Sequence, residues 1–530
     1  MGGPARAAPP PPGAAHASLR QPACDLIGGA WLPIPGDRVV SRNPARPADV
    51  IWSGAPDAAH VDHAVAASRG ALHAWSRWTR EKRFAVLRRL RAIYEREATR
   101  IADLIRDETG KVMWDAKAEA GALAAKIDIT LDATEFGPLR RVTGFDLPLG
   151  GSRTGRCWFR PHGVMAVLAP YNFPAHLANG HIIPALAMGN TVILKPSDKT
   201  PGVGQLLADL IQEALDAEGA PPGVINLVQG AADIASALAR HPGVDGILFT
   251  GSWPVGRKIL EANLDTPGRI IALEMGGNNA AVVMPDADLK QAAIECVRSA
   301  FVTTGQRCTC TRRLVVHKEI AARFIPAVCK VASNLIVGDP RADYPVFMGP
   351  MIGEQARAGV LEFQARVARF ASARVLLESS ALDGGTGGWY LTPGVIEVEQ
   401  FELASETGGV GADVEVFGPL LRVAVVESLD AAIEQANATR FGLAASIFTK
   451  DAGAIDRVLN EARAGCVNVN TGTAGASSKL PFGGLGRSGN HRPAGSFSLD
   501  YCAYPVAGMI ETGDAATVHP GMRFEDGWLR

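Results

Sequence analysis

The stretch of sequence that decides the fold is GVMAVLAPYNFPAHLANGHIIPALAMGNTVIL, at residues 163–194. It begins with a short apolar run at 163–168 and ends with a second one at 191–194. Residues 176–188, between the two runs, are expected to form a helix. Two short β-type runs separated by a helical stretch are typical of a βαβ unit, whose strands lie parallel in one sheet.

The same alternation continues along the chain. We expect helices near 202–217 and 232–240, and strands at 224–228 and 246–249. Apolar runs that alternate with helices predict an α/β fold with a parallel sheet buried on both faces. The functional crevice of such a sheet lies at the carboxyl ends of its strands. A second α/β region is expected from about 275 to 470.

Composition and charge restrict the possible function classes. Of the 530 residues, 47% are hydrophobic and 20% are charged, which is typical of a globular protein with a large core. The net charge of −1 gives no field that would attract nucleic acid or an anionic membrane. No apolar run approaches the ~20 residues of a membrane span.

The eight cysteines form no CxxC pair, so we expect neither a disulfide scaffold nor a metal site. A reducing compartment, the cytoplasm, fits this usage. Residues 1–22 are rich in Pro and Ala and contain no acid, which predicts a disordered extension. Four prolines at 9–12 disfavour the amphipathic helix of a transit peptide.

Each predicted strand end carries a loop whose polar side chains could take part in chemistry. Asn172 lies between aromatic residues in a Pro-bounded turn, where it could donate to an oxyanion or only shape the loop. Lys195 and Asp198 could bind ribose hydroxyls or be solvated loop charges. Ser252, after Gly251, could hold a phosphate at a helix start or belong to an ordinary turn.

Two further stretches, EMGGN at 274–278 and GQRC at 305–308, place a carboxylate and a thiol beside glycine turns. A thiol and a carboxylate in one pocket suit covalent catalysis, with the thiol as nucleophile and the carboxylate as base. A free cysteine is more often a buried apolar residue, although the polar neighbours of Cys308 predict partial exposure. Cys310 would share its face in a strand, so spacing does not choose between the two.

Taken together and in this order, the motifs resemble the aldehyde dehydrogenase superfamily from residue 28 to residue 505. The resemblance implies an NAD-dependent enzyme that oxidises a small aldehyde. It also implies a dinucleotide-binding domain at 23–145 and 161–273, and an α/β catalytic domain at 274–470. A small bridging β segment, at 146–160 and 485–507, would assemble homodimers or homotetramers.

The resemblance assigns roles to single residues. Cys308, rather than Cys310, becomes the nucleophile, Glu274 the general base for hydrolysis, and Asn172 the oxyanion donor. The cofactor-binding residues that it implies are Lys195, Asp198, Gly251, Ser252, Gly256, Glu415 and Phe417. Asp198 stands where the family usually has Glu, which keeps the carboxylate and still favours NAD.

Within the superfamily, residues 170–181, 274–279, 305–310 and 488–493 are similar to the branch that oxidises N-succinylglutamate 5-semialdehyde in arginine breakdown. This aldehyde carries two carboxylates, so its pocket should contain cationic or amide donors. The candidates from motif proximity are Arg307, His181, Arg492 and Lys479. The alternatives are a dehydrogenase of glutamate or succinate semialdehyde and a catalytically silent member of the fold.

Overall fold

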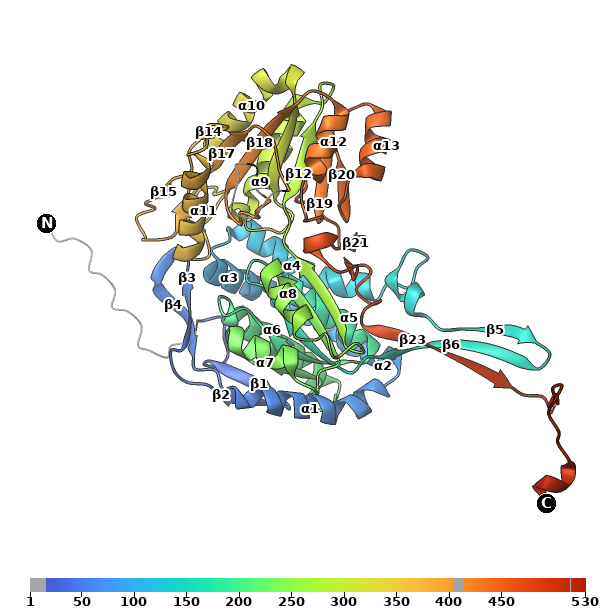
Figure 1. Cartoon of the computed structure of the whole chain (residues 1–530). Coiled ribbons are helices and arrows are strands. Elements are labelled where there is room, and N and C mark those ends of the chain that lie inside the picture. Colours follow the sequence, from blue (N-terminus) through green and yellow to red (C-terminus); the bar gives the residue numbers. More distant parts are fainter. Residues whose placement is uncertain (1–15, 404–410, 412, 515) are drawn as a thin grey trace.

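The chain folds into two lobes, each built on a seven-stranded sheet (Figure 1). The computed structural model describes residues 16–403, 411, 413–514 and 516–530. The first lobe, blue to green in Figure 1, lies below the second, which is yellow to orange. An arm of three strands projects from the first lobe and ends near the C-terminus.

The first sheet has the strand order β11-β10-β7-β8-β9-β1-β2. The strands from β11 to β9 pair in parallel, and β1 and β2 extend the sheet as antiparallel strands. This confirms the predicted βαβ order. The strands are β1 (Cys24–Ile27), β2 (Ala30–Pro33), β7 (Val164–Leu168), β8 (Thr191–Lys195), β9 (Ile225–Leu227), β10 (Gly246–Gly251) and β11 (Ile270–Met275).

Helices cover both faces of this sheet because successive side chains of each strand point in opposite directions. Met165 and Val167 of β7 pack into one apolar core, and Val164 and Ala166 pack into another. All four side chains have no exposed area. The helices of this lobe are α1 (Ala59–Ser76), α2 (Arg80–Arg96), α3 (Ala98–Thr109), α4 (Met113–Thr130), α5 (His176–Met188), α6 (Pro201–Ala217), α7 (Ala232–Arg240) and α8 (Trp253–Glu261).

The second sheet has the order β14-β17-β18-β13-β12-β19-β20 and is parallel except for β14. Its strands are β12 (Asn279–Val283), β13 (Thr311–His317), β14 (Ala373–Leu377), β17 (Gly394–Val398), β18 (Leu420–Val426), β19 (Ala444–Phe448) and β20 (Cys466–Val469). Its helices are α9 (Leu289–Phe301), α10 (Lys318–Ser333), α11 (Glu354–Val367), α12 (Leu429–Asn437) and α13 (Ala452–Glu461). The chain therefore passes from one sheet to the other between Met275 and Asn279.

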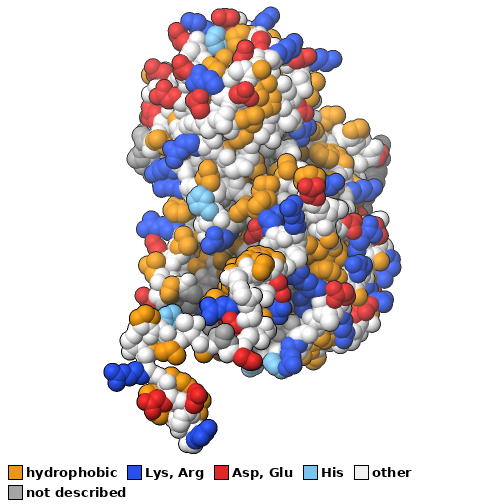
Figure 2. Space-filling view, turned by 90° about the vertical axis from the view of Figure 1, so that its right-hand side faces the viewer, with side chains coloured by type: hydrophobic (Ala, Val, Ile, Leu, Met, Phe, Trp, Pro, Cys, Tyr) orange, Lys and Arg blue, Asp and Glu red, His pale blue; other side chains and the backbone are white. Residues whose placement is uncertain are grey.

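The arm consists of β5 (Phe145–Gly150), β6 (Arg153–Pro161) and β23 (Ala503–Glu511). β6 pairs antiparallel with both of its neighbours, and Tyr504 lies opposite Arg160. The C-terminal extended segment therefore pairs along its whole length with the strand that begins at Arg153. Figure 2 shows the face from which the arm projects, where hydrophobic side chains are scattered among charged ones.

The bridging segment predicted at 485–507 is too long at its beginning. Residues 494 and 495 form β22 and line the cavity described below, and Leu499 and Tyr501 are buried in the core of the first lobe. The aromatic and apolar side chains of this stretch fill the body of the molecule, so only residues from Ala503 onward join the arm.

The predicted disordered extension at 1–22 is wrong for its last seven residues; residues 1–15 lie outside the described part of the chain. The ring of His16 contacts the carboxylate of Asp107 at 3.0 Å. Gln205 donates to the backbone carbonyls of Gln21 and Pro22. Side-chain hydrogen bonds and the packing of Leu19 against the core of the first lobe hold this segment in place, and composition reveals neither.

Short elements complete the structure. Three strand pairs are β3 (Val39–Asn43) with β4 (Arg46–Gly54), β15 (Ala381–Leu382) with β16 (Tyr390–Leu391), and β21 (Pro481–Phe482) with β22 (Ala494–Gly495). The 3-10 helices are η1 (Pro138–Val142), η2 (Val302–Gly305), η3 (Gly486–Ser488) and η4 (Asp526–Leu529). Over the described ranges, no helix is both long and apolar enough to cross a membrane.

Candidate active site

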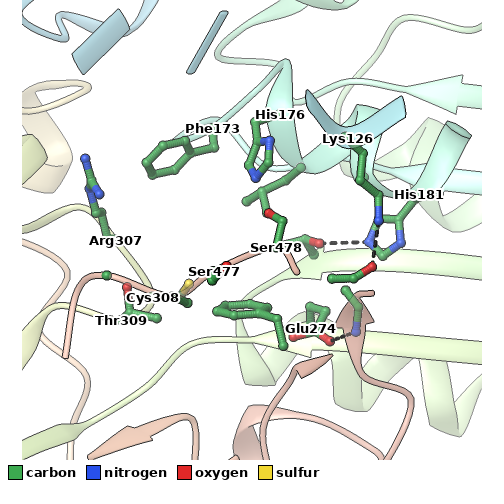
Figure 3. A pocket seen from close by; sticks show the side chains of 18 residues that line it. Lys126, Phe173, His176, His181, Glu274, Arg307, Cys308, Thr309, Ser477 and Ser478 are labelled. Atoms are coloured by element: carbon green, nitrogen blue, oxygen red, sulfur yellow. Dashed lines mark hydrogen bonds between the residues drawn. The ribbon is translucent and has the colours of Figure 1, made fainter. Parts of the chain in front are cut away.

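A cavity of about 190 Å³ receives side chains from both lobes and from the C-terminal stretch before the arm (Figure 3). Glu274 and Thr250 come from adjacent strands of the first sheet, and Cys308 follows the 3-10 turn η2 of the second lobe. Residues 475–478 and 494–495 close another part of the wall. The thiol and the carboxylate that sequence reasoning singled out therefore line one cavity.

The turn before Cys308 has an unusual backbone. Thr303, Thr304 and Gly305 all have positive φ, at 54°, 55° and 70°. A Cβ atom at Gly305 would lie 2.2 Å from the carbonyl oxygen of Gly418, so the turn requires glycine there. After it, the backbone carbonyl of Cys308 accepts a hydrogen bond of 2.7 Å from Asn279 Nδ2. The turn fixes the backbone from which the thiol enters the cavity.

The two neighbouring cysteines occupy different environments. Cys308 is partly exposed and lines the cavity, whereas Cys310 is fully buried against Val302 and Ala474. Burial, followed by the charges of Glu415 and Glu274, raises the pKa of the Cys308 thiol to about 12. At neutral pH this thiol is therefore protonated in the resting protein and needs a partner to accept its proton before it can react.

Glu274 lies near the end of β11, directly opposite Thr250 of β10. Its Oε1 atom accepts a hydrogen bond of 3.3 Å from the backbone N–H of Ala494, and its buried Oε2 atom has no partner in the described structure. Burial raises the pKa of this carboxyl well above its ordinary value. A carboxylate with a raised pKa and a free oxygen facing a cavity suits a general base.

Asn172 lies behind Cys308 rather than in the cavity wall. Its Nδ2 atom donates a hydrogen bond of 3.0 Å to the backbone carbonyl of Gln306, two residues before Cys308. The side chain is buried, and the neighbouring Tyr171 ring contacts Phe417 edge to face at 6.1 Å. An amide has two N–H donors, so one bond to Gln306 leaves a second donor for an oxyanion.

The predicted nucleotide residues gather at the carboxyl ends of the first sheet. Lys195 ends β8 and is buried, and burial lowers its pKa to about 8. No carboxylate within the described part of the chain lies at ion-pair distance from Lys195. The carboxylate of Asp198 instead lies 3.5 Å from Lys199. An unpaired ammonium at a strand end fits the hydroxyl groups of a ribose.

The turn from β10 into α8 is tightly packed. A Cβ atom at Gly251 would lie 2.4 Å from the Phe249 ring, and one at Gly256 would lie 2.4 Å from the sulfur of Met275. Ser252 is the N-cap residue of α8, but its exposed side chain makes no capping bond. Its hydroxyl and the helix N-terminus are thus available to a phosphate.

Glu415 and Phe417 approach the catalytic turns from the second lobe. Glu415 Oε1 accepts a hydrogen bond of 2.9 Å from the N–H of Gly277, and burial raises its pKa. A Cβ atom at Gly276 would lie 1.8 Å from Glu415 Oε2, and one at Gly277 would lie 2.7 Å from the carbonyl oxygen of Cys308, so both glycines allow these close approaches. Together with the turn around Ser252, these contacts are compatible with a dinucleotide that reaches from the first sheet to Cys308.

Of the four predicted substrate residues, Arg307 and His181 line the cavity, whereas Arg492 and Lys479 do not. Arg307 lines the cavity, stacks on Phe173 at 4.9 Å, and pairs with buried Asp115 at 2.7 Å. His181 also lines it, but both ring nitrogens are used, by Tyr501 at 2.9 Å and Thr250 at 3.1 Å.

Burial lowers the pKa of His181 to about 3, and both of its ring nitrogens already have partners, so a direct contact of His181 with the substrate stays a prediction. Arg492 and Lys479 are both exposed and are not part of the cavity lining. Arg492 instead borders a separate surface depression beside His162. Proximity to a motif in sequence therefore did not predict which side chains enter the cavity.

Sequence reasoning missed two basic residues of the cavity wall, Lys126 and His176. Lys126 comes from α4, far from every motif, and no local signal distinguishes it from a surface lysine of an amphipathic helix. His176 lies within the quoted stretch 170–181, where the signal was present but was assigned to His181 alone. Among the described residues, no group of three His, Cys, Asp or Glu side chains could hold a metal ion.

The chain belongs to the aldehyde dehydrogenase family, whose model matches residues 31–505. It is thus an aldehyde-oxidising oxidoreductase, and the fold, the thiol and the buried carboxylate agree with this class.

Among its relatives is N-succinylglutamate 5-semialdehyde dehydrogenase 2 of Caulobacter vibrioides, 44% identical, with 91% of this chain and 95% of the relative covered. The N-succinylglutamate 5-semialdehyde dehydrogenase of Paraburkholderia xenovorans is 40% identical, with 94% of this chain and 99% of the relative covered. A solved indole-3-acetaldehyde dehydrogenase complexed with NAD+ has a TM-score of 0.84 at 28% identity, covering 93% of this chain and 97% of that one.

Proposed function

We propose that this protein oxidises N-succinyl-L-glutamate 5-semialdehyde to N-succinyl-L-glutamate in arginine catabolism, with NAD as hydride acceptor. The proposal rests mainly on one observation. The Cys308 thiol and the Glu274 carboxylate, whose Oε2 atom has no partner in the described structure, line the same cavity. The relatives that bear this substrate in their names cover almost the whole chain, which supports the choice of aldehyde.

The chemistry begins when the Cys308 thiol gives its proton to the Glu274 carboxylate, which passes it to solvent. The sulfur then adds to the aldehyde carbon, which turns the carbonyl oxygen into an oxyanion. The second N–H of Asn172 and the backbone N–H of Cys308 stabilise that charge; one such donor contributes about 2.7–4 kcal/mol. NAD supplies the acceptor for the hydride that leaves the same carbon. The acyl group then remains on Cys308 as a thioester.

Glu274 carries the second half of the reaction. Its free Oε2 atom takes a proton from a water molecule, whose oxygen attacks the thioester carbon. The carbon–sulfur bond breaks, the acid is released, and Glu274 passes the proton that it took from water to the departing Cys308 sulfur. The cofactor residues are Lys195 and Asp198 for the adenine-side ribose, Gly251, Ser252 and Gly256 for the phosphates, and Glu415 with Phe417 for the nicotinamide side.

We also propose that the domains follow the two lobes, with the dinucleotide bound by the first and catalysis carried by 274–470. The arm would join copies of the chain into a homodimer or homotetramer. Its exposed apolar side chains support this role, since Phe145 is 57% exposed and Met509 is 80% exposed. All eight cysteines are free, which supports the cytoplasm as the compartment.

The proposal is tested by steady-state kinetics of NADH formation with three aldehydes: N-succinylglutamate, glutamate and succinate semialdehyde. We expect the highest kcat/KM for the succinylated aldehyde and a product identified by mass spectrometry as N-succinylglutamate. A higher kcat/KM for either of the other two would replace this substrate. No NADH with any aldehyde would support a catalytically silent protein.

A further inference from the structure

Lys126 is a buried lysine in the wall of the catalytic cavity. It lies on α4, is 2% exposed, and donates hydrogen bonds to the carbonyl of Gly495 at 2.6 Å and to Ser498 Oγ at 2.8 Å. Both acceptors are neutral. Figure 3 shows its ammonium directed toward the cavity, on the opposite side from Arg307.

A buried ammonium without an anion is costly, because a charge removed from water needs a partner. No carboxylate in the described ranges lies at ion-pair distance from Lys126. Lys111, on the neighbouring part of the chain, shows the usual solution, since its ammonium pairs with the buried carboxylate of Glu119. Lys126 therefore lacks the kind of partner that Lys111 has.

His176 provides a second unsatisfied group in the same wall. Its buried Nδ1 atom has no hydrogen-bond partner in the described structure, and the residue lines the cavity between Phe173 and Lys126. Burial and then the positive charges of Lys126, Lys111 and Arg307 lower the pKa of His176 to about 4. This part of the cavity thus contains one ammonium, that of Lys126, with only neutral acceptors, and one ring nitrogen, His176 Nδ1, with no partner in the described structure.

We infer that Lys126 binds a carboxylate of the substrate, with His176 beside it, and so selects aldehydes with an anionic tail. The inference rests on the proposed function for the identity of the aldehyde. A bound carboxylate would form an ion pair with the Lys126 ammonium, whereas an uncharged aldehyde would leave this ammonium without an anion. The effect should appear in KM and not in kcat, because Lys126 touches the tail and not the reacting carbon.

The test compares wild type with Lys126→Met on three aldehydes: N-succinylglutamate semialdehyde, N-acetylglutamate semialdehyde and hexanal. Loss of a hydrogen-bonded charge should raise KM for the anionic aldehyde on the order of 10–100-fold and leave kcat nearly unchanged. A rise for the succinylated form alone assigns the succinyl carboxylate. A rise for both anionic forms assigns the α-carboxylate. Activity with hexanal should be unaffected.

Equal losses for hexanal and the anionic aldehydes, or no change in any KM, would overturn the inference. If Lys126→Met does not fold, Lys126→Gln keeps a donor for Gly495 and removes the charge. The same result is expected: a raised KM for the anionic aldehydes and unchanged activity with hexanal. Lys117→Met is the matched control, since this lysine lies on the same helix, α4, but is exposed and outside the cavity lining. The kcat/KM values of the wild type for the different aldehydes test the proposed function separately. If the wild type prefers an unsuccinylated anionic aldehyde whose KM depends on Lys126, the proposed substrate is refuted but the role of Lys126 is not.

Discussion

The side of the cavity that carries Cys308 and Glu274 differs from the side that carries Lys126 and His176 in how the chain builds it. The first side is made by two short glycine-containing turns that are recognisable in the sequence, although Gly305 and Gly276 face residues that are distant along the chain. The second side is made by α4, the start of α5 and the C-terminal stretch, whose sequences carry no such motif for Lys126. The reacting groups can therefore be recognised from short motifs, whereas the residues proposed to bind the aldehyde tail are brought together by packing alone.

The largest expected effect is on the side that carries Cys308 and Glu274. Cys308→Ser should lower turnover on the order of 10⁴-fold or more, because the nucleophile is lost. NADH formation with saturating aldehyde and NAD measures this loss. Cys310→Ser is the matched control and should keep its turnover, since Cys310 is buried away from the cavity. The reverse result would identify Cys310 as the nucleophile and contradict the assignment of Cys308.

Glu274→Gln should lower kcat by about 10²–10⁴-fold, the range for loss of a general base. Hydrolysis needs the ionised carboxylate, and burial raises its pKa. In the wild type, the rate of thioester hydrolysis should therefore rise with pH until that raised pKa is passed, and fall as the carboxyl is protonated. Single-turnover hydrolysis measured against pH should lose this rise in the variant. An unchanged profile would exclude Glu274 as the base.

Lys111 and Lys126 give different predictions for stability. Lys111→Met leaves the buried Glu119 carboxylate unpaired, so the free energy of unfolding should fall by about 3–5 kcal/mol. Lys126→Met removes a charge that has no anion but also the donor to Gly495 and Ser498, so without any aldehyde present its loss of stability should be smaller than that of Lys111→Met. Urea unfolding of the two variants measures the difference. Equal destabilisation would mean that Lys126 is a structural residue like Lys111.

The smallest effect is expected on the cofactor. Lys195→Ala removes one charged donor, which contributes about 1.5–3 kcal/mol, so KM for NAD should rise with little change in kcat. Initial rates at varied NAD and fixed aldehyde measure it. Lys199→Ala, at the neighbouring exposed lysine, is the control and should leave KM for NAD unchanged. An equal rise in both variants would indicate a general charge effect rather than a site at Lys195.

The sequence predicted the parts of this molecule that depend on neighbours along the chain. The parallel order of β7 and β8 followed from two apolar runs and a helix, and the turns of Glu274 and Cys308 followed from their glycines. The role of Lys126 could not be predicted, because its carbonyl partner at Gly495 lies far away in sequence. The hydrogen bonds of His181 to Tyr501 and Thr250 could not be predicted either, because only the fold brings these residues near it.

The central claim is that Cys308 and Glu274 carry two successive halves of one oxidation. It is tested most directly by mixing Glu274→Gln with N-succinylglutamate semialdehyde and NAD and recording intact mass and the modified peptide. We predict one burst of NADH per active site and an N-succinylglutamyl thioester on the peptide that contains Cys308. A variant that turns over without an accumulated adduct, or an adduct placed on Cys310, would contradict the claim.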